Sequence, residues 1–92
     1  MKNETIIAAA KKIGRKKQIN IAIEELSELI QALCKLNRKG SEVEYRCRLM
    51  DIHEEIADVE IAITQLKLSF EMDPAVKSWK EVKLERLARL LY

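Results

Sequence analysis

The chain of 92 residues has few of the residues that build turns, strands or cross-links. Aromatic residues make up 4% of it, with two Gly and one Pro, which argues against a β-sandwich or barrel. Two Cys can form at most one disulfide, which is too few for a disulfide-stabilised scaffold. The longest purely apolar run, residues 6–10, is far shorter than the roughly 20 residues of a membrane helix and too short for a secretory signal. A cytoplasmic protein with reduced thiols and no membrane partner is expected.

The residues that are abundant favour helices. Apolar residues make up 48% of the chain and charged residues 35%, and Ala, Glu, Lys, Leu, Ile and Arg dominate. This apolar content is too high for a disordered tail. Lys and Arg number 17 against 15 Asp and Glu, so a net charge of +2 gives no strong attraction to nucleic acid. The length allows one small all-α domain, residues 1–92.

Four helices are predicted, over residues 3–13, 15–38, 41–70 and 73–92. Asn3 is a plausible N-cap of the first helix, and Gly14 marks a break after it. Ser41 followed by Glu44 is the signature of a capping box. The pair at residues 73–74, Asp then Pro, is typical of a cap and the first helical position.

The two long helices carry apolar residues at alternating steps of three and four, which is a heptad seam. The seam of the second helix consists of Ile19, Ile23, Leu26, Ile30 and Leu33, and that of the third of Leu49, Ile52, Ile56, Val59, Ile63, Leu66 and Phe70. Antiparallel neighbours have residue numbers with a constant sum, and one register with a sum of 82 pairs Ile19 with Ile63 and Leu33 with Leu49. The pattern predicts an antiparallel hairpin whose turn is centred on Ser41.

Each long helix also has apolar residues outside its seam. These are Ala22, Leu29 and Leu36 on the second helix, and Ala57, Ile61 and Leu68 on the third. A helix that is apolar on more than one side is buried on more than one side. We expect the first and fourth helices, with Trp79 as an anchor, to cover part of this surface. A second copy would cover the rest, so that a homo-oligomeric helical bundle forms, either a dimer or a tetramer.

Two carboxylate pairs with i, i+3 spacing face each other across the hairpin: Glu25 with Glu28, and Glu55 with Asp58. Glu25 with Asp58 and Glu28 with Glu55 both sum to 83, so the pairs lie at one height. Four carboxylates repel at such a distance unless a cation joins them. Hard oxygen ligands suit Mg²⁺ or Mn²⁺. The alternative is a solvated acidic face.

These acidic residues carry a resemblance to a known family. Residues 14–66 resemble the MazG-like branch of the all-α nucleoside triphosphate pyrophosphatases, whose pattern is E-E-x-x-E followed by E-x-x-D. This chain reads Glu24-Glu25-x-x-Glu28 and then Glu55-x-x-Asp58. The resemblance implies Mg²⁺-dependent hydrolysis of a nucleoside triphosphate to the monophosphate and pyrophosphate. It implies that Glu25, Glu28, Glu55 and Asp58 form the catalytic metal site.

Three further residues are candidates for substrate binding. Gln18 precedes the acidic motif and could contact a base or ribose, or it could be an ordinary surface amide. Lys83 and Arg86 are placed by the resemblance where they could reach phosphates, and the alternative is a solvated basic face. A different class of function, a non-catalytic helical interaction module, stays open. Nucleic acid is not expected as a partner, because the charge is balanced and aromatic residues are scarce.

Overall fold

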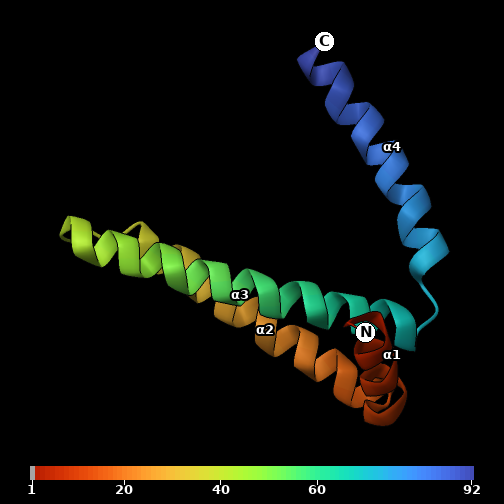
Figure 1. The fold of residues 1–92 in the computed structure, drawn as a ribbon. Helices are drawn as coiled ribbons and strands as arrows, with labels where there is room; N and C mark the ends of the chain where they lie inside the picture. The colour runs from red at the N-terminus through yellow and green to blue at the C-terminus, as the bar shows by residue number, and fades with distance from the viewer. Residues whose placement is uncertain (1) are drawn as a thin grey trace.

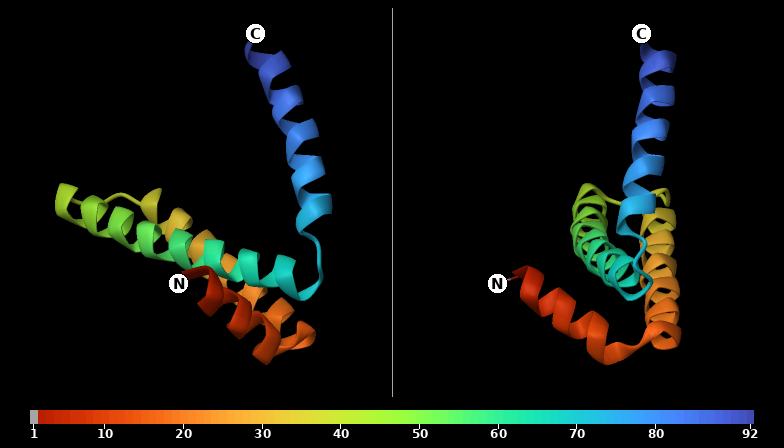
Figure 2. Two further views of the ribbon diagram at one scale, coloured as in Figure 1. Left: turned by 45° about the vertical axis from the view of Figure 1, so that its right-hand side comes forward. Right: turned by 90° about the vertical axis from the view of Figure 1, so that its right-hand side faces the viewer.

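A computed structural model describes residues 2–92 (Figure 1). Within these residues the chain forms four helices and no strand. The helices are α1 (Lys2–Ile13), α2 (Arg15–Leu36), α3 (Glu42–Ser69) and α4 (Asp73–Leu91). The predicted all-α fold is confirmed, and the two long helices pack side by side as an antiparallel hairpin (Figures 1 and 2).

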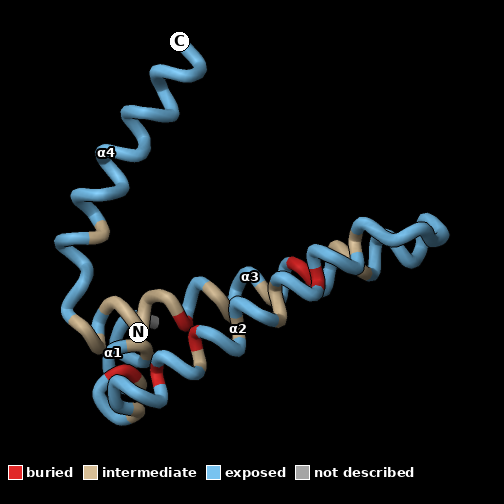
Figure 3. The backbone as a smooth tube through the Cα atoms, turned by 180° about the vertical axis from the view of Figure 1, so that it is seen from behind, coloured by how far each residue is buried: buried red, intermediate tan, exposed pale blue. Residues whose placement is uncertain are grey.

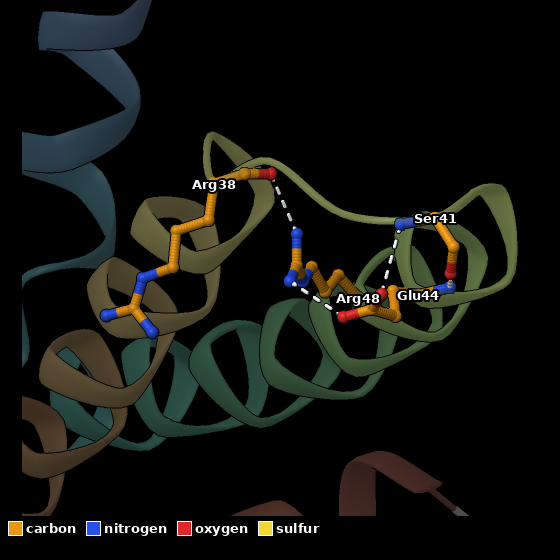
Figure 4. A network of polar contacts seen from close by, with 4 residues as sticks. All are labelled: Arg38, Ser41, Glu44 and Arg48. Atoms are coloured by element: carbon orange, nitrogen blue, oxygen red, sulfur yellow. Dashed lines mark hydrogen bonds and ion pairs between the residues drawn. The ribbon is translucent and has the colours of Figure 1, made fainter.

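The turn between α2 and α3 is held by a compact polar network (Figure 4). The backbone N–H of Glu44 donates to the Ser41 hydroxyl at 3.1 Å, and the Ser41 N–H donates back to the Glu44 carboxylate at 3.0 Å, which confirms the capping box. Arg48 donates to the backbone carbonyl of Arg38 at 2.8 Å and pairs with Glu44 at 3.5 Å. A Cβ at Gly40 would lie 3.2 Å from the Arg48 guanidinium, a tight contact that would require this side chain to shift by a few tenths of an ångström. These contacts tie the end of α2 to the start of α3.

The other end of the hairpin is closed by Arg15. Its Nε donates to the carbonyl of Ser69 at 2.9 Å, and its guanidinium lies 5.3 Å from the centroid of the Phe70 ring. Just before it, Gly14 adopts φ = 82°, a left-handed value that a glycine accepts without strain, so α1 turns back across the hairpin (Figure 2). The predicted break at Gly14 is confirmed.

Three predicted helix ends are displaced by one or two residues. Asn3 lies inside α1 instead of capping it. α2 ends at Leu36, because the N–H groups of Asn37 and Arg38 bond to carbonyls three residues back and tighten the last turn. Met72 occupies the cap position of α4, with Asp73 as the first helical residue.

The face of α2 that meets α3 differs from the predicted seam. Its buried residues are Gln18, Ala22 and Ala32. The five predicted seam residues are instead exposed, by 40% at Leu26 up to 60% at Ile30. α3 keeps its seam better, since Ile52 is buried, although Ile56 is 41% exposed. The seam prediction for α2 was wrong because this helix has two apolar stripes, and periodicity does not say which of them faces α3.

α4 stands away from the rest of the chain (Figures 1 and 2). None of its residues is buried (Figure 3). Trp79 is 59% exposed. The predictions that the fourth helix covers the hairpin and that Trp79 is a core anchor are therefore wrong for a single chain. The joint explains the direction: the N–H of Met72 bonds to the carbonyl of Lys67 and that of Glu71 to Leu68, a Schellman turn, which points the chain away from the hairpin.

A single copy is neither compact nor well covered. Its radius of gyration is 16.4 Å, whereas about 12 Å is typical of a folded chain of this length. Its accessible surface is 7725 Å², against about 5,500 Å² for a monomer of 10.7 kDa. No helix among residues 2–92 is both long and apolar enough to cross a membrane.

Candidate metal centre

The four predicted carboxylates converge at mid-height of the hairpin. Glu25 and Glu28 come from α2, and Glu55 and Asp58 from α3. One oxygen of each lies within 4.8 Å of one oxygen of every other. The i, i+3 spacing puts each pair on adjacent turns of one helix side, and the register set by the turn brings the two pairs level. The predicted juxtaposition of these four side chains is confirmed.

The cluster is electrostatically costly as it stands. One carboxylate oxygen of Glu25 and one of Glu55 are buried without a hydrogen-bond partner. Burial, and then repulsion by Glu28, Asp58 and Glu55, raises the pKa of Glu25 above its ordinary value of 4.5. Burial and repulsion by Glu28 and Asp58 raise the pKa of Glu55 in the same way. Both effects are relieved by a cation between the two helices.

The donor set is chemically uniform, because all four groups offer carboxylate oxygens and neither His nor Cys belongs to the cluster. Hard divalent cations with oxygen preferences fit such a set, whereas zinc in protein sites usually takes nitrogen or sulfur ligands. The buried oxygens without partners would serve as ligand atoms. The residues present therefore fit Mg²⁺ or Mn²⁺.

A hollow of about 160 Å³ opens from the cluster toward the hairpin turn. Its walls include Glu28 and Glu55 together with Asp51, and two cations, Lys35 and Arg48, lie at its far side. Neither basic residue was predicted as part of the site. The signal was present, since Lys35 and Arg48 sum to 83, the same constant that pairs the carboxylates.

A second hollow, of about 150 Å³, opens on the other side of the cluster, toward α1. It is lined by Ile21, Glu25, Asp58, Ile61, Ala62 and Gln65. Gln18, predicted to contact substrate, is 0% exposed and offers no surface to a ligand. Its Nε2 donates to the Oε1 of Gln65 at 3.1 Å, and it is Gln65 that lines the hollow. Gln65 was missed, although it too pairs with Gln18 at a sum of 83.

The basic candidates of α4 are not at this site in a single chain. Lys83 and Arg86 lie on the helix that points away from the hairpin (Figure 1). The ammonium group of Lys83 lies 5.9 Å from the centroid of the Trp79 ring, on its own helix. A role for these two residues in phosphate binding therefore needs α4 of another copy.

Comparisons with known proteins do not assign this chain to a family. No protein-family model, no curated protein and no solved structure matches it. The paired carboxylates and the hollows beside them are the features on which a functional assignment rests.

Proposed function

We propose that the chain is a Mg²⁺- or Mn²⁺-dependent pyrophosphohydrolase that converts a nucleoside triphosphate and water into a nucleoside monophosphate and pyrophosphate. The observation that carries the proposal is the convergence of four carboxylates from two helices within 4.8 Å, two of them with buried oxygens that lack partners. The choice of reaction comes from the resemblance of residues 24–28 and 55–58 to the MazG-like pattern. The cytoplasm, where nucleotides and Mg²⁺ are available, is the proposed location.

The roles of the residues follow from their positions. Glu25, Glu28, Glu55 and Asp58 would hold the cation, which would supply charge neutralisation for the phosphates and a lowered pKa of a nearby water. A water oxygen bonds to phosphorus, the anhydride bond to the leaving pyrophosphate breaks, and the water gives up a proton. Asp51 lines the same hollow as Glu28 and Glu55 and can accept that proton. Glu24, the first glutamate of the motif, does not line either hollow beside the cluster.

The turn side of the cluster suits the phosphate tail. Lys35 lies on the wall of that hollow and presents a positive charge to an anionic leaving group. Arg48 contributes charge there while its guanidinium is held by the Arg38 carbonyl and Glu44. Lys83 and Arg86 would add to this set from α4 of a second copy.

A homo-oligomer is part of the proposal. The exposed stripe of α2, defined by Ile19, Ile23, Leu26, Ile30 and Leu33, repeats at heptad spacing, as in helices that pack against a partner helix. At 100° per residue it lies about 150° around α2 from Glu25 and Glu28, so a partner on the stripe leaves the carboxylates open. The accessible surface exceeds that of a typical monomer by about 2,200 Å², more than one side of a standard interface hides.

The proposal is tested with purified protein, Mg²⁺ and a panel of ribo- and deoxyribonucleoside triphosphates. Pyrophosphate and monophosphate in equal amounts are expected. The variants Glu28→Gln and Asp58→Asn should each lower kcat by about 100-fold or more, with circular dichroism unchanged. Glu60→Gln, an exposed glutamate of the same helix outside the cluster, is the matched control. Release of orthophosphate alone, or no turnover with any nucleotide, would overturn the proposal.

The alternative function, a non-catalytic helical interaction module, draws support from the exposed apolar stripe of α2 and from the uncovered α4. It predicts that Mg²⁺ does not raise the melting temperature. It also predicts that Glu28→Gln leaves stability unchanged or increased in the presence of Mg²⁺. A titration with Mg²⁺ and a non-hydrolysable nucleotide, followed by thermal melting, separates the two functions.

A further inference from the structure

The corner between α1 and α2 carries the densest run of like charges in the chain. Residues 11–17 read Lys-Lys-Ile-Gly-Arg-Lys-Lys, so five of these seven residues are basic and none is acidic. Only Gly14 separates the two helices, which brings the last turn of α1 and the first turn of α2 together (Figure 2). Consecutive Cα atoms are about 3.8 Å apart, so neighbouring charges lie within a Debye length of about 8 Å. We call these five basic residues the basic corner.

The four lysines of the basic corner carry charge that the chain does not neutralise. Lys11, Lys12, Lys16 and Lys17 are all exposed, and none forms an ion pair within residues 2–92. Arg15 differs from them, because the Ser69 carbonyl and the Phe70 ring hold its guanidinium. Four cations elsewhere in the chain each pair with a carboxylate: Arg46, Arg48, Lys67 and Arg89.

Two hollows lie at the basic corner. The first, of about 400 Å³, has three cations among its walls, Arg15, Lys16 and Lys17. The second, of about 370 Å³, has Lys11 and Arg15 on its wall, together with one carboxylate, that of Glu71. A concave surface lined by cations can follow a chain of phosphates.

Helix stability explains only half of these lysines. Lys11 and Lys12 lie in the last turn of α1, where a positive charge is favourable. Lys16 and Lys17 lie in the first turn of α2, which contains no acidic residue and where a positive charge is unfavourable. The five cations also repel one another. A bound polyanion would offset both costs.

The side chains around the basic corner favour nucleic acid over a membrane. A surface site on a bilayer combines cations with apolar side chains that insert into it, whereas none of residues 11–17 is a large exposed hydrophobic residue. The ring beside the corner, Phe70, already faces Arg15, so contacts with phosphates and not base stacking are expected. The net charge of +2 speaks against nucleic acid only when charges are spread evenly, and here they are concentrated.

We propose that the basic corner binds the phosphate backbone of nucleic acid without regard to base sequence. Each lysine that contacts a phosphate releases a counterion, so the affinity falls as salt is added. Contacts by four lysines predict a slope of about −3.6 in a plot of log binding constant against log salt concentration for duplex DNA. Lys17 precedes Glu25 by eight residues, about 12 Å along α2, so this surface is separate from the carboxylate cluster.

Fluorescence anisotropy with a short labelled DNA duplex tests the proposal, in EDTA so that no divalent cation occupies the carboxylates. The double variant Lys12→Gln, Lys16→Gln should bind about tenfold more weakly at low salt and show a slope of about −1.8. The matched control is Lys77→Gln, Lys80→Gln, which removes two exposed cations of α4 and should change neither quantity. Equal losses in the two double variants, or no binding by the unaltered protein at low salt, would refute the proposal.

Other ligands for the basic corner are separated in the same way. Sedimentation with vesicles of equal parts phosphatidylcholine and phosphatidylserine, without duplex binding, would assign the corner to a membrane and contradict the proposal. A change of solution mass in Lys12→Gln, Lys16→Gln, with duplex binding unchanged, would assign it to a contact between copies and likewise contradict it.

The hydrolysis assay separates this inference from the proposed function. The kcat and KM for nucleoside triphosphates should be unchanged in Lys12→Gln, Lys16→Gln, because these lysines lie outside the carboxylate site. A raised KM with unchanged duplex binding would assign the corner to substrate steering and exclude the inference. Salt-dependent duplex binding by a protein that hydrolyses no nucleotide would keep the inference and refute only the proposed function.

Discussion

The hairpin and α4 are both long amphipathic helical elements, but only the hairpin takes its geometry from its own chain. Arg48 and Ser41 hold one end of the hairpin, and Arg15 holds the other. α4 is attached through one Schellman turn and one ion pair, Lys67 with Asp73 at 3.3 Å, and buries nothing. Side chains on the hairpin therefore have defined neighbours in one copy. Lys83 and Arg86, on α4, are exposed in one copy.

The largest effect should come from a charge placed on the exposed stripe of α2. Ile23→Glu puts a carboxylate where a second copy would bury it, at an expected cost of about 3–5 kcal/mol to association. Light scattering after size exclusion should show a shift from oligomer to single chains. Met50→Glu, at a residue that is 67% exposed outside the stripe, is the control. An unchanged mass for Ile23→Glu would show that the stripe is not an interface between copies. The surface of the hairpin would then stay uncovered, like that of α4.

A smaller effect separates the two regions by their contribution to stability. Ile52→Ala removes a buried side chain from the hairpin core and should lower the free energy of unfolding by about 3 kcal/mol. Leu87→Ala, on the exposed α4, should change the same quantity by about 0.5 kcal/mol or less in dilute solution. Urea denaturation followed by circular dichroism measures both. Equal losses would contradict the independence of α4 from the hairpin.

The carboxylate cluster gives a pH dependence that α4 lacks. The pKa values of Glu25 and Glu55 are raised above 4.5, so without divalent cations their contribution to stability is lost as the pH rises through those values. The melting temperature should therefore increase as the pH is lowered from neutral toward 4.5. The pKa of Glu44 is lowered from 4.5 by its capping bonds to Ser41. The stability that Glu44 contributes is therefore lost only when the pH falls below about 4.5.

On the proposed function Mg²⁺ would bind the deprotonated carboxylates, and it should then reverse this trend. At 100 times its Kd it should stabilise the chain by about 2.7 kcal/mol at neutral pH, with the gain vanishing toward pH 4.5. The double variant Glu25→Gln, Glu55→Gln should show neither response. A melting temperature that falls on acidification of the cation-free protein, with the same slope in the double variant, would argue against a strained cluster.

The smallest effect concerns the joint between the two regions. Glu71 adopts φ = 53°, a left-handed conformation that costs a non-glycine residue about 1 kcal/mol. Glu71→Gly should stabilise α3 and its cap by about 0.5–1 kcal/mol in thermal melts, because glycine suits this position of a Schellman turn. Glu71→Ala, which retains a Cβ, should bring no such gain. A loss of stability with glycine would mean that the Glu71 side chain fixes the direction of α4.

The fold class, the capping box, the break at Gly14 and the convergence of the four carboxylates could all be predicted. Each depends on local spacing or on the single constant that relates paired residues. Whether α2 turns its seam or its second stripe toward α3 could not be predicted, because both stripes are apolar. The position of α4 was also out of reach, since it follows from backbone hydrogen bonds at residues 70–72 and not from an apolar pattern.

The residues of the site also divide into those that could be predicted from the sequence and those that could not. The register constant would have identified Gln65, Lys35 and Arg48 had it been applied to polar residues as well as to carboxylates. The burial of Gln18 could not be read from the sequence, because a glutamine at that position is equally compatible with an exposed amide. Gln18 lies among the buried residues of α2 and donates a hydrogen bond to Gln65 of α3, and this pairing depends on which face of α2 meets α3.

The brevity of the turn at residues 37–41 has a kinetic consequence. Closing so short a loop costs little chain entropy, and hairpin contacts between α2 and α3 begin only a few residues apart, which favours fast folding. The hairpin should thus form as a unimolecular step whose rate does not depend on protein concentration. Covering of the α2 stripe would follow as a second-order step, so that dilution slows assembly while the carboxylates have already met.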